Sequence, residues 1–436
     1  MQSFLSSLIV LIVVAWLYAD CCLDLMHVRL DWLQDGLTLF SPCAAGDGDN
    51  GSTQIQFDVL DFQATGDGVA DDTQAFLDAW LATCGTTLGV PTMIIPKDKI
   101  FLVKPVIFKG PCNSSNVNVQ IDGTLVAPEA PSMWKDIDAS LWLQFDSVDG
   151  LILKGSGLIN GRGANWWQQS CKIRHGEGCT KLAPTAVKLM RCKDLVLSNL
   201  KLVDSPQTHV LIQGSQRVSV TNLKITAPAA SPNTDGIHIH ASHDVLIENT
   251  VIGTGDDCIS IGDDIYHVTI QRIICGPGHG ISVGSLGKGG SNASVEEISV
   301  SSVKFFNTTN GVRIKTWQGA TGYAKSISFD HISFNNVANP VMIDQYYCDV
   351  RGKCPSQEKA VQISDVTYSY LSGSSKTRVA VSLNCSQNVA CTGLHFESIN
   401  ITTSFPETDS EAFCINAHGD TKGYIHPNMS CLLQQT

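Results

Sequence analysis

The stretch from Gly236 to Val283 reads GIHIHASHDVLIENTVIGTGDDCISIGDDIYHVTIQRIICGPGHGISV, and its pattern decides the fold. Short runs of alternating apolar residues begin at Ile237, Ile259 and Ile281, which are evenly spaced in the sequence. A second kind of apolar run, such as the one around Val245, lies between them. Short strands at a constant period, joined by polar turns, indicate coils that stack and share one core.

The same alternation recurs from about Leu151 to the C-terminal region, with a period that lengthens toward the end of the chain. We therefore predict an all-β fold, a right-handed parallel β-helix (solenoid). A β-sandwich is the alternative, but it would show turn signals every 8–12 residues or so without repetition at the length of a coil.

An amphipathic helix is predicted at Gln74–Cys84, because Phe76, Ala79 and Trp80 fall on one face of it. The run Asp71–Thr73 offers an N-cap for this helix. A solenoid needs its first coil covered, so we expect an N-terminal capping helix.

Three regions are expected along the chain: a signal peptide at 1–19, an irregular segment at 20–54 and the β-helix catalytic domain at 55–436. The apolar run Leu5–Leu17 is too short for a convincing membrane span. It lacks the usual preceding basic residue, so an uncleaved anchor is the alternative.

Sixteen cysteines suit an oxidising compartment. Together with seven Asn-x-Ser/Thr sequons, they predict a secreted, extracellular glycoprotein; the sequons are at Asn50, Asn113, Asn292, Asn307, Asn384, Asn400 and Asn428. Close spacing suggests five local disulfides: Cys171–Cys179, Cys258–Cys275, Cys348–Cys354, Cys385–Cys391 and Cys414–Cys431. Cys84–Cys112 is a longer pairing, and spacing alone leaves the connectivity open. Zinc is the alternative for such pairs, although the chain contains no CxxC.

The formal net charge is −12 and no Lys/Arg cluster is present, which argues against a nucleic-acid partner. An acidic enzyme acting on a polyanion needs its cations focused in one place. Arg313 and Lys315 meet that need, because they alternate with apolar residues and so point to one face. The forked guanidinium of Arg313 and the ammonium of Lys315 on one face suit a carboxylate ligand. An ordinary exposed strand face would show the same sequence pattern.

The candidate catalytic residues follow the repeat. Asp235, Asp257 and His279 recur at the same interval as the isoleucine runs, and Asp256 adjoins Asp257. Residues one repeat apart lie one rung apart, so these groups should gather in one column. Carboxylates that close cannot all ionise easily, so at least one pKa must rise, as a general acid requires.

Two alternative interpretations apply to these acids. Aspartates commonly occupy turns for their own hydrogen bonding, and clustered carboxylates suit calcium. The neighbouring cations and His279 argue against a site made only of oxygen ligands. A metal site at His238 and His240 is a further alternative to solvated or outer-shell histidines.

The motifs Asn233–Gly236, Gly255–Cys258, Gly278–Gly280 and Arg313–Lys315 resemble those of plant-type polygalacturonases of glycoside hydrolase family 28. The resemblance runs from about Phe57 to Cys431. It includes further motifs at Gly66–Asp72, Gly161–Gly163, Trp166–Trp167, Thr316–Gly319 and Asp344–Cys348.

This resemblance implies inverting hydrolysis of α-1,4 bonds between galacturonates, with no metal and no cofactor. It implies that Asp256 is the general acid, that Asp235 and Asp257 activate water, and that His279 supports the acid. The implied substrate-binding residues are Asn233, Arg313, Lys315 and Tyr347. The implied inverting arrangement separates acid and base by about 6.5–9.5 Å.

From the sequence we expect a monomeric cell-wall enzyme whose substrate is polygalacturonate. We expect it to bind no nucleic acid, and no membrane after removal of the signal peptide. The alternatives are a rhamnogalacturonan or xylogalacturonan hydrolase, a calcium-dependent pectate lyase and an inactive wall-binding protein.

Overall fold

The computed structural model of the chain describes residues 55–174, 179–349, 354–405 and 407–434. The expected signal peptide and the segment 20–54 lie outside these residues. Within the described part, the strands pair in parallel and form two sheets.

The smaller sheet has eleven strands, each paired with the corresponding strand of the next coil. Its strands are β5 (Val106–Lys109), β8 (Leu143–Asp146), β11 (Val187–Met190), β14 (Val210–Gln213), β17 (Ile237–His240), β19 (Ile259–Ile261), β21 (Ile281–Leu286), β23 (Asn310–Trp317), β25 (Asn339–Tyr347), β27 (Val379–Asn384) and β29 (Glu411–Ile415).

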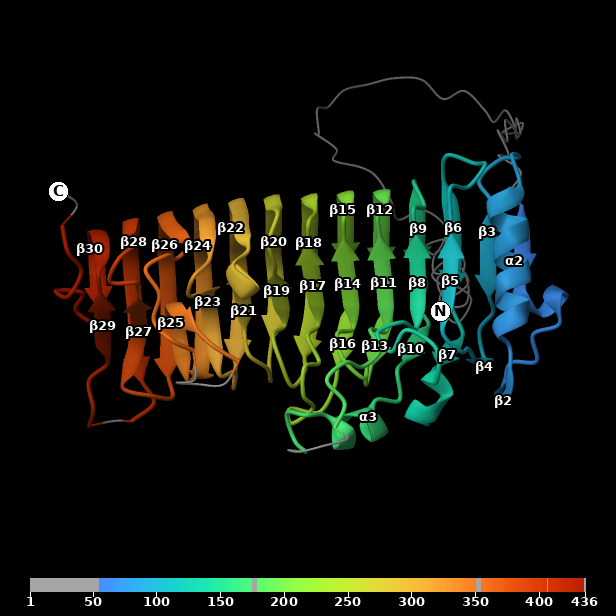
Figure 1. Cartoon of the computed structure of the whole chain (residues 1–436), viewed down its shortest axis with the longest axis horizontal. Coiled ribbons are helices and arrows are strands. Elements are labelled where there is room, and N and C mark those ends of the chain that lie inside the picture. Colours follow the sequence, from blue (N-terminus) through green and yellow to red (C-terminus); the bar gives the residue numbers. More distant parts are fainter. Residues whose placement is uncertain (1–54, 175–178, 350–353, 406, 435–436) are drawn as a thin grey trace, which may run out of the picture. The chain divides into compact units, whose positions relative to one another are not determined.

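The larger sheet forms the other two sides of each coil. In its first coils each side has its own short strand: β1 (Gln56–Asp58), β2 (Asp67–Asp71), β3 (Thr92–Ile95), β4 (Ile100–Leu102), β6 (Val117–Ile121), β7 (Thr124–Val126), β9 (Leu151–Lys154), β10 (Leu158–Asn160), β12 (Lys193–Ser198), β13 (Lys201–Val203), β15 (Gln216–Thr221) and β16 (Lys224–Thr226). Single long strands then span both sides: β18 (His243–Gly253), β20 (Ile265–Cys275), β22 (Asn292–Phe306), β24 (Thr321–Val337), β26 (Gln362–Ser375), β28 (Cys391–Thr403) and β30 (Ala417–His426). Figure 1 shows these strands side by side in sequence order.

The core is a set of columns along the stacked coils. Ile237 pairs with Ile259, and Ile259 pairs with Ile281, so the repeat seen in the sequence is the register of the smaller sheet. All three side chains are fully buried. Each coil covers the apolar face of its neighbour, which confirms the predicted parallel β-helix and excludes the β-sandwich.

Stacking begins earlier than the sequence indicated. We expected repetition from about Leu151, but β1 already pairs with β3, and β3 pairs with β6. These first strands are short and are interrupted by α2, which hid their period.

The predicted capping helix is α2 (Thr73–Gly85), and Phe76, Ala79 and Trp80 are buried beneath it. Asp72 lies at the N-cap position, but its carboxylate does not cap the helix. It accepts hydrogen bonds instead from the backbone N–H groups of Thr65 and Gly66, which lie just before β2. A short helix that we did not expect, α3 (Ala164–Gln169), and three 3₁₀ turns, η1 (Val59–Phe62), η2 (Pro131–Trp134) and η3 (Lys288–Gly290), complete the described helical elements.

All six predicted disulfides are present. Of the six sequons within the described residues, five asparagines are exposed, and only Asn384 is half-buried on β27. None of the described helices is long and apolar enough to cross a membrane.

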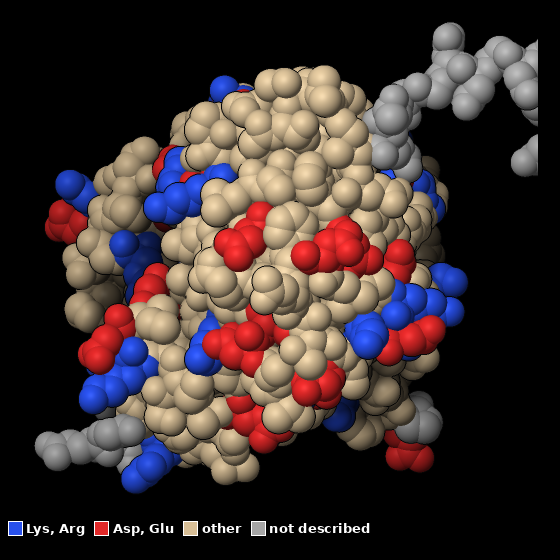
Figure 2. Space-filling model, turned by 90° about the vertical axis from the view of Figure 1, so that its right-hand side faces the viewer, with Lys and Arg blue, Asp and Glu red and all other residues tan. Residues whose placement is uncertain are grey.

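The face beside α2 carries both signs of charge. Figure 2 shows Lys and Arg side chains on this face lying next to Asp and Glu. Asp71, at the end of β2 just before α2, forms a 2.8 Å ion pair with Lys104. On the described part of this face, the interspersed charges do not offer a polyphosphate a continuous basic surface.

Candidate active site

The predicted catalytic groups lie where the chain enters strands of the smaller sheet. Asp235 precedes β17, Asp256 and Asp257 precede β19, and His279 precedes β21. Because these strands are stacked in register, their entry turns meet at one edge of the sheet. Backbone bonds join the turns directly: His279 N–H donates to the Asp256 carbonyl at 2.7 Å.

Glycine is required at two positions in these turns. A side chain on Gly255 would lie 1.9 Å from the Ser231 carbonyl oxygen, so only glycine permits this approach. Gly280 has φ +86°, and a side chain there would lie 2.3 Å from the Asn310 carbonyl oxygen. The glycines beside the acids and His279 therefore let neighbouring coils close on each other.

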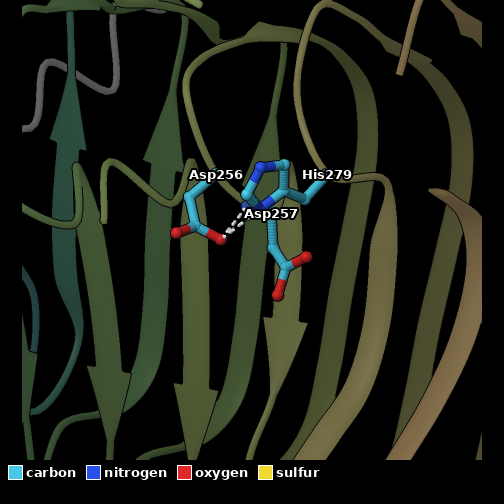
Figure 3. A group of neighbouring side chains, drawn as sticks. All are labelled: Asp256, Asp257 and His279. Carbon is cyan, nitrogen blue, oxygen red and sulfur yellow. Dashed lines mark hydrogen bonds and ion pairs between the residues drawn. The ribbon is translucent and has the colours of Figure 1, made fainter. Parts of the chain in front are cut away.

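Asp256 and His279 form the outer pair of the site. Figure 3 shows the two side chains pointing toward each other, and His279 Nδ1 lies 2.9 Å from Asp256 Oδ1. Burial lowers the pKa of His279, but the hydrogen bond and charge of Asp256, with the charge of Asp257, outweigh it and leave the pKa raised. The side chains of His279 and Asp256 are 38% and 20% exposed, so both can reach a ligand.

Asp257 is the buried anion of the site, and its side chain is 2% exposed. Its Oδ1 lies 2.8 Å from Arg313 Nη2, and its Oδ2 lies 2.8 Å from Lys315 Nζ. Ser282 Oγ also donates to Oδ1 at 2.9 Å. Burial would raise the pKa of Asp257, but the charges of Lys315 and Arg313 prevail and lower it to about 2.

Asp235 has the opposite electrostatics. Burial, followed by the charges of Asp256 and Asp257, raises the pKa of Asp235 to about 8. Its Oδ2 accepts a hydrogen bond of 2.7 Å from Ser260 Oγ. The expectation that one carboxyl must retain a proton is thus met at Asp235, while the resemblance assigned the donor role to Asp256.

The backbone of Asp235 is held by a buried histidine. The Asp235 carbonyl oxygen accepts from the backbone N–H of His209 at 2.8 Å and lies 3.1 Å from His209 Nδ1. His209 Nε2 in turn accepts from the Ser205 N–H at 3.3 Å, so Nδ1 carries the ring proton. Burial lowers the pKa of His209 to about 4 and keeps this tautomer neutral.

Tyr347 contacts the network, whereas Asn233 lines a recess. Lys315 Nζ lies 5.2 Å from the centroid of the Tyr347 ring, which packs edge-on against Trp317. Asn233 helps to line a narrow recess together with Gln207. Among the described residues, the Asn233 side chain has no hydrogen-bond partner, which leaves its amide available to a ligand.

The donor set does not fit a metal ion well. One oxygen each from Asp256 and Asp257 and one ring nitrogen of His279 lie within 4.8 Å of one another. However, Asp257 already accepts hydrogen bonds from two cationic side chains, and His279 bonds to Asp256. Two positive charges beside the oxygens oppose the entry of a divalent cation.

The sequence of this site and the sheet that carries it match one protein family. The family model described as "Glycosyl hydrolases family 28" matches residues 84–431. The chain belongs to glycosyl hydrolase family 28. It is 45% identical to a polygalacturonase of Malus domestica over 85% of this chain and 78% of that protein. A probable polygalacturonase of Arabidopsis thaliana is 41% identical over 87% of this chain and 84% of its own length.

Solved structures share the family 28 fold. An endo-xylogalacturonan hydrolase from Aspergillus tubingensis has a TM-score of 0.71 at 24% identity, covering 83% of this chain and 98% of that one. An exopolygalacturonase from Thermotoga maritima has a TM-score of 0.66 at 19% identity, covering 80% and 89%. At these identities, the structures support the β-helix fold alone.

This family 28 site contains residues that we did not predict. Ser260 and Ser282 bind the Asp235 and Asp257 carboxylates, and His209 fixes the Asp235 backbone. The two serines could have been found, because each follows a core isoleucine by one position and they lie one repeat apart. His209 left no such signal, since a single buried histidine has no pattern.

One oxygen of Asp256 lies within 4.8 Å of one oxygen of Asp257. This distance joins single atoms, whereas the separation of about 6.5–9.5 Å that is typical of inverting sites joins the two carboxyl groups. Asp257 is nevertheless a poor nucleophile, because its charge is neutralised by Arg313 and Lys315. The short spacing alone therefore does not indicate a retaining mechanism.

Proposed function

We propose that this family 28 glycosidase is a polygalacturonase that hydrolyses α-1,4 bonds between galacturonates of homogalacturonan. The observation that carries the proposal is the pair of Arg313 and Lys315 beside the Asp256–His279 pair. A uronate substrate requires cations next to the acids that cleave its glycosidic bond. Relatives named polygalacturonase, 41–45% identical, support the same substrate.

The two cations can serve Asp257 and a substrate together. Lys315 has three N–H donors, and one bonds to Asp257. Arg313 uses Nε for Ser282 and Nη2 for Asp257. Within the described residues, the remaining donors have no partner, so they can bind the carboxylate of a galacturonate without releasing Asp257.

We assign proton donation to the glycosidic oxygen to Asp256. Its carboxyl is partly exposed and hydrogen-bonded to His279, whereas Asp235 is tied to Ser260. The charge of Asp256 contributes to the raised pKa of Asp235, so a proton is held on a carboxyl beside the proposed donor. Asp235 and Asp257 then orient the attacking water, and Asn233 and Tyr347 contact the substrate.

We further propose that the mature enzyme works outside the cell, in the cell wall, as a glycosylated monomer. Six disulfides and five exposed sequon asparagines support an extracellular location. Mass spectrometry of the secreted protein would identify the mature N-terminus and glycosylated positions.

The test of function is incubation with de-esterified polygalacturonate, with and without chelator. We expect reducing ends to be released in both cases, without the ultraviolet absorbance of unsaturated ends. Asp256→Asn should retain pectin binding and lose activity by roughly 10²–10⁴-fold. Chelator-sensitive release of unsaturated ends would identify a lyase, and activity only on branched pectin would identify another hydrolase.

The same reaction decides two further points. Rapid loss of viscosity per bond cleaved identifies endo cleavage, whereas reducing ends with little viscosity loss identify exo cleavage. The anomer released first, followed by proton NMR, should be inverted. Retention would show that one carboxylate acts as a nucleophile.

A further inference from the structure

We propose that His238 is a positioning residue that acts through Ser260 on the Asp235 carboxyl. The kinetic part of this inference rests on the proposed function, whereas the hydrogen-bond chain does not. His238 was considered above only as half of a His-x-His pair with His240. The structure supports a different use for it.

The three groups form a continuous hydrogen-bonded chain. His238 Nδ1 lies 2.7 Å from Ser260 Oγ, and Ser260 Oγ lies 2.7 Å from Asp235 Oδ2. His238 on β17 pairs in register with Ser260 on β19, so both side chains leave the same face of the smaller sheet. The contact is therefore built into the stacking of two coils.

The direction of the chain follows from the number of protons. Ser260 has one hydroxyl proton, so it cannot donate to both neighbours. An ionised Asp235 only accepts, and Ser260 must then donate to Oδ2 and accept from His238. His238 consequently carries its ring proton on Nδ1.

This chain determines which oxygen of Asp235 remains available. Oδ2 is occupied by Ser260, so Oδ1 is left to face the attacking water or to carry a proton. Fixing one oxygen also fixes the rotation of the carboxyl group. When the carboxyl is already oriented, less activation free energy is needed to align it with the attacking water.

The surroundings keep His238 neutral. Burial, followed by the charges of His240 and Lys315, lowers the pKa of His238 to about 4, against an opposing effect of Asp257. Asp235 itself faces Asp256, Asp257 and Lys315. Above about pH 4, His238 is therefore neutral and adds no charge to an already crowded site.

His240 provides a matched control. It lies on the same strand and face, and its ring stacks on His238 with centroids 6.4 Å apart. Within the described residues, its side chain makes no hydrogen bond to the acids. Replacing it changes the packing and charge near His238 but leaves the chain to Asp235 intact.

The first experiment does not depend on activity. Nitrogen-15 NMR of histidine-labelled full-length enzyme at pH 9, where Asp235 is ionised, should show His238 as the neutral Nδ1–H tautomer. Ser260→Ala should abolish that preference, and His240→Ala should preserve it. An Nε2–H tautomer in the wild type would overturn the proposal whatever the enzyme hydrolyses.

The second experiment is kinetic and uses polygalacturonate. Ser260→Ala and His238→Ala should each lower kcat roughly tenfold with little change in KM, as expected for the loss of one buried hydrogen bond. Ser260→Ala should also shift the alkaline limb of the pH profile to higher pH, because Asp235 loses the hydrogen bond that lowers its pKa. His238→Asn, whose amide nitrogen can occupy the Nδ1 position, should recover most of the loss.

Three outcomes contradict the kinetic prediction. Equal losses in His238→Ala and His240→Ala, or equal losses in His238→Ala and His238→Asn, would show a packing role only. An unshifted pH profile in Ser260→Ala would likewise overturn the positioning role. If the wild type does not act on polygalacturonate, the proposed function fails while the NMR result still decides the chain.

Discussion

At the residue scale, the site separates two adjacent kinds of carboxyl by environment. Asp257 is ionised against Arg313 and Lys315, and Asp235 retains a proton near neutral pH. Burial raises the pKa of both carboxyls, so the difference between their pKa values comes from the charges of Lys315 and Arg313 beside Asp257. Such opposed pKa values in one cluster are typical of acid–base sites.

Replacing Asp235 by Asn should stabilise the protein at pH 7. The pKa of Asp235 rises from an ordinary value near 3.8 to about 8 on folding, so folding opposes its ionisation. That cost is absent below pH 3.8, grows as the pH rises and is complete above about 8. Asn retains an acceptor for Ser260, and we expect the melting temperature at pH 7 to rise by roughly 2–4 °C.

Scanning calorimetry at two pH values checks this prediction. The difference between Asp235→Asn and wild type should vanish near pH 3. Asp257→Asn is the opposite control, because its lowered pKa contributes stability that is present above pH 3.8 and lost toward pH 2. That variant should melt lower than wild type at pH 7, and equal shifts in both variants would contradict the assignment.

The pH profile of kcat/KM should fall as the pH rises through about 8. This value is the pKa of Asp235, and ionisation of Asp235 removes the protonated carboxyl that the site holds beside Asp256. Asp257 cannot account for losses between pH 3 and 6, because its pKa is about 2. Initial rates on short galacturonates from pH 3 to 10 provide the measurement, and an alkaline limb below pH 6 would refute it.

Sequence alone identified the charged residues of the site but not which of them form ion pairs and hydrogen bonds with one another. The constant period of the repeat placed Asp235, Asp257 and His279 in one column. It could not reveal that Arg313 and Lys315 would pair with Asp257, because the long side chains could have turned either way. The repeat spacing of Ser260 and Ser282 was a signal that could have been used, but no sequence pattern encodes the 2.7 Å contact of Ser260 Oγ with Asp235 Oδ2.

At the element scale, the disulfide Cys258–Cys275 anchors the turn that carries the acids. It begins directly after Asp257 and spans 17 residues, ending at the last residue of β20. Replacing both cysteines by Ala should cost roughly 3 kcal/mol and also lower kcat, because the Asp256–Asp257 turn gains freedom.

Cys414–Cys431 is the matched control, since it also spans 17 residues but lies near the C-terminal end of the solenoid. Its removal should cost a similar free energy of unfolding, measured by urea denaturation, with kcat unchanged below the melting transition. An equal fall in kcat for both pairs would show that the effect on activity is not local.

The aromatic column of the larger sheet contains one tyrosine, Tyr368, whose hydroxyl is buried. Tyr368 stacks between Phe329 and Phe396, with ring centroids 5.2 and 4.7 Å apart. Its hydroxyl is buried and has no hydrogen-bond partner among the described residues. Tyr368→Phe removes that unsatisfied group and should stabilise the protein by about 1 kcal/mol. Urea denaturation checks this; a loss of stability would reveal a hidden partner for the hydroxyl.

Strand positions were predictable where apolar residues alternate, because alternation is itself the geometry of a half-buried strand. The bends of the long strands were not. Asn249, Arg272 and Ser302 adopt positive φ at equivalent bends of β18, β20 and β22. Only asparagine among these favours that conformation by itself, so the stacking of neighbouring coils must impose it on the others.

At the scale of the whole described domain, the stability of each coil depends on its packing against the neighbouring coils. Each coil contacts mainly its neighbours, so the cap at the first coil protects the rest. Trp80 of α2 packs against Phe108 and Phe145, and its Nε1 donates to the Lys109 carbonyl at 3.0 Å. Trp80→Ala should therefore cost about 3–5 kcal/mol.

Hydrogen exchange would show how far that damage extends. In Trp80→Ala, amides of β1, β3 and β6 should exchange faster, while those of β22–β28 should remain protected. Uniform acceleration along the chain would show that the solenoid unfolds as a single unit. The fold class was predictable at this scale because repetition averages over many weak local signals, whereas the first coils lack enough repeats.

The order of the site residues along the solenoid has a consequence for biosynthesis. Asp235, Asp256 and Asp257 leave the ribosome well before Arg313 and Lys315 on β23. Asp257 gains both of its counterions only when the coil that carries β23 stacks on β21. The site is therefore complete only in a chain that extends through β23, beyond the last of its carboxylates.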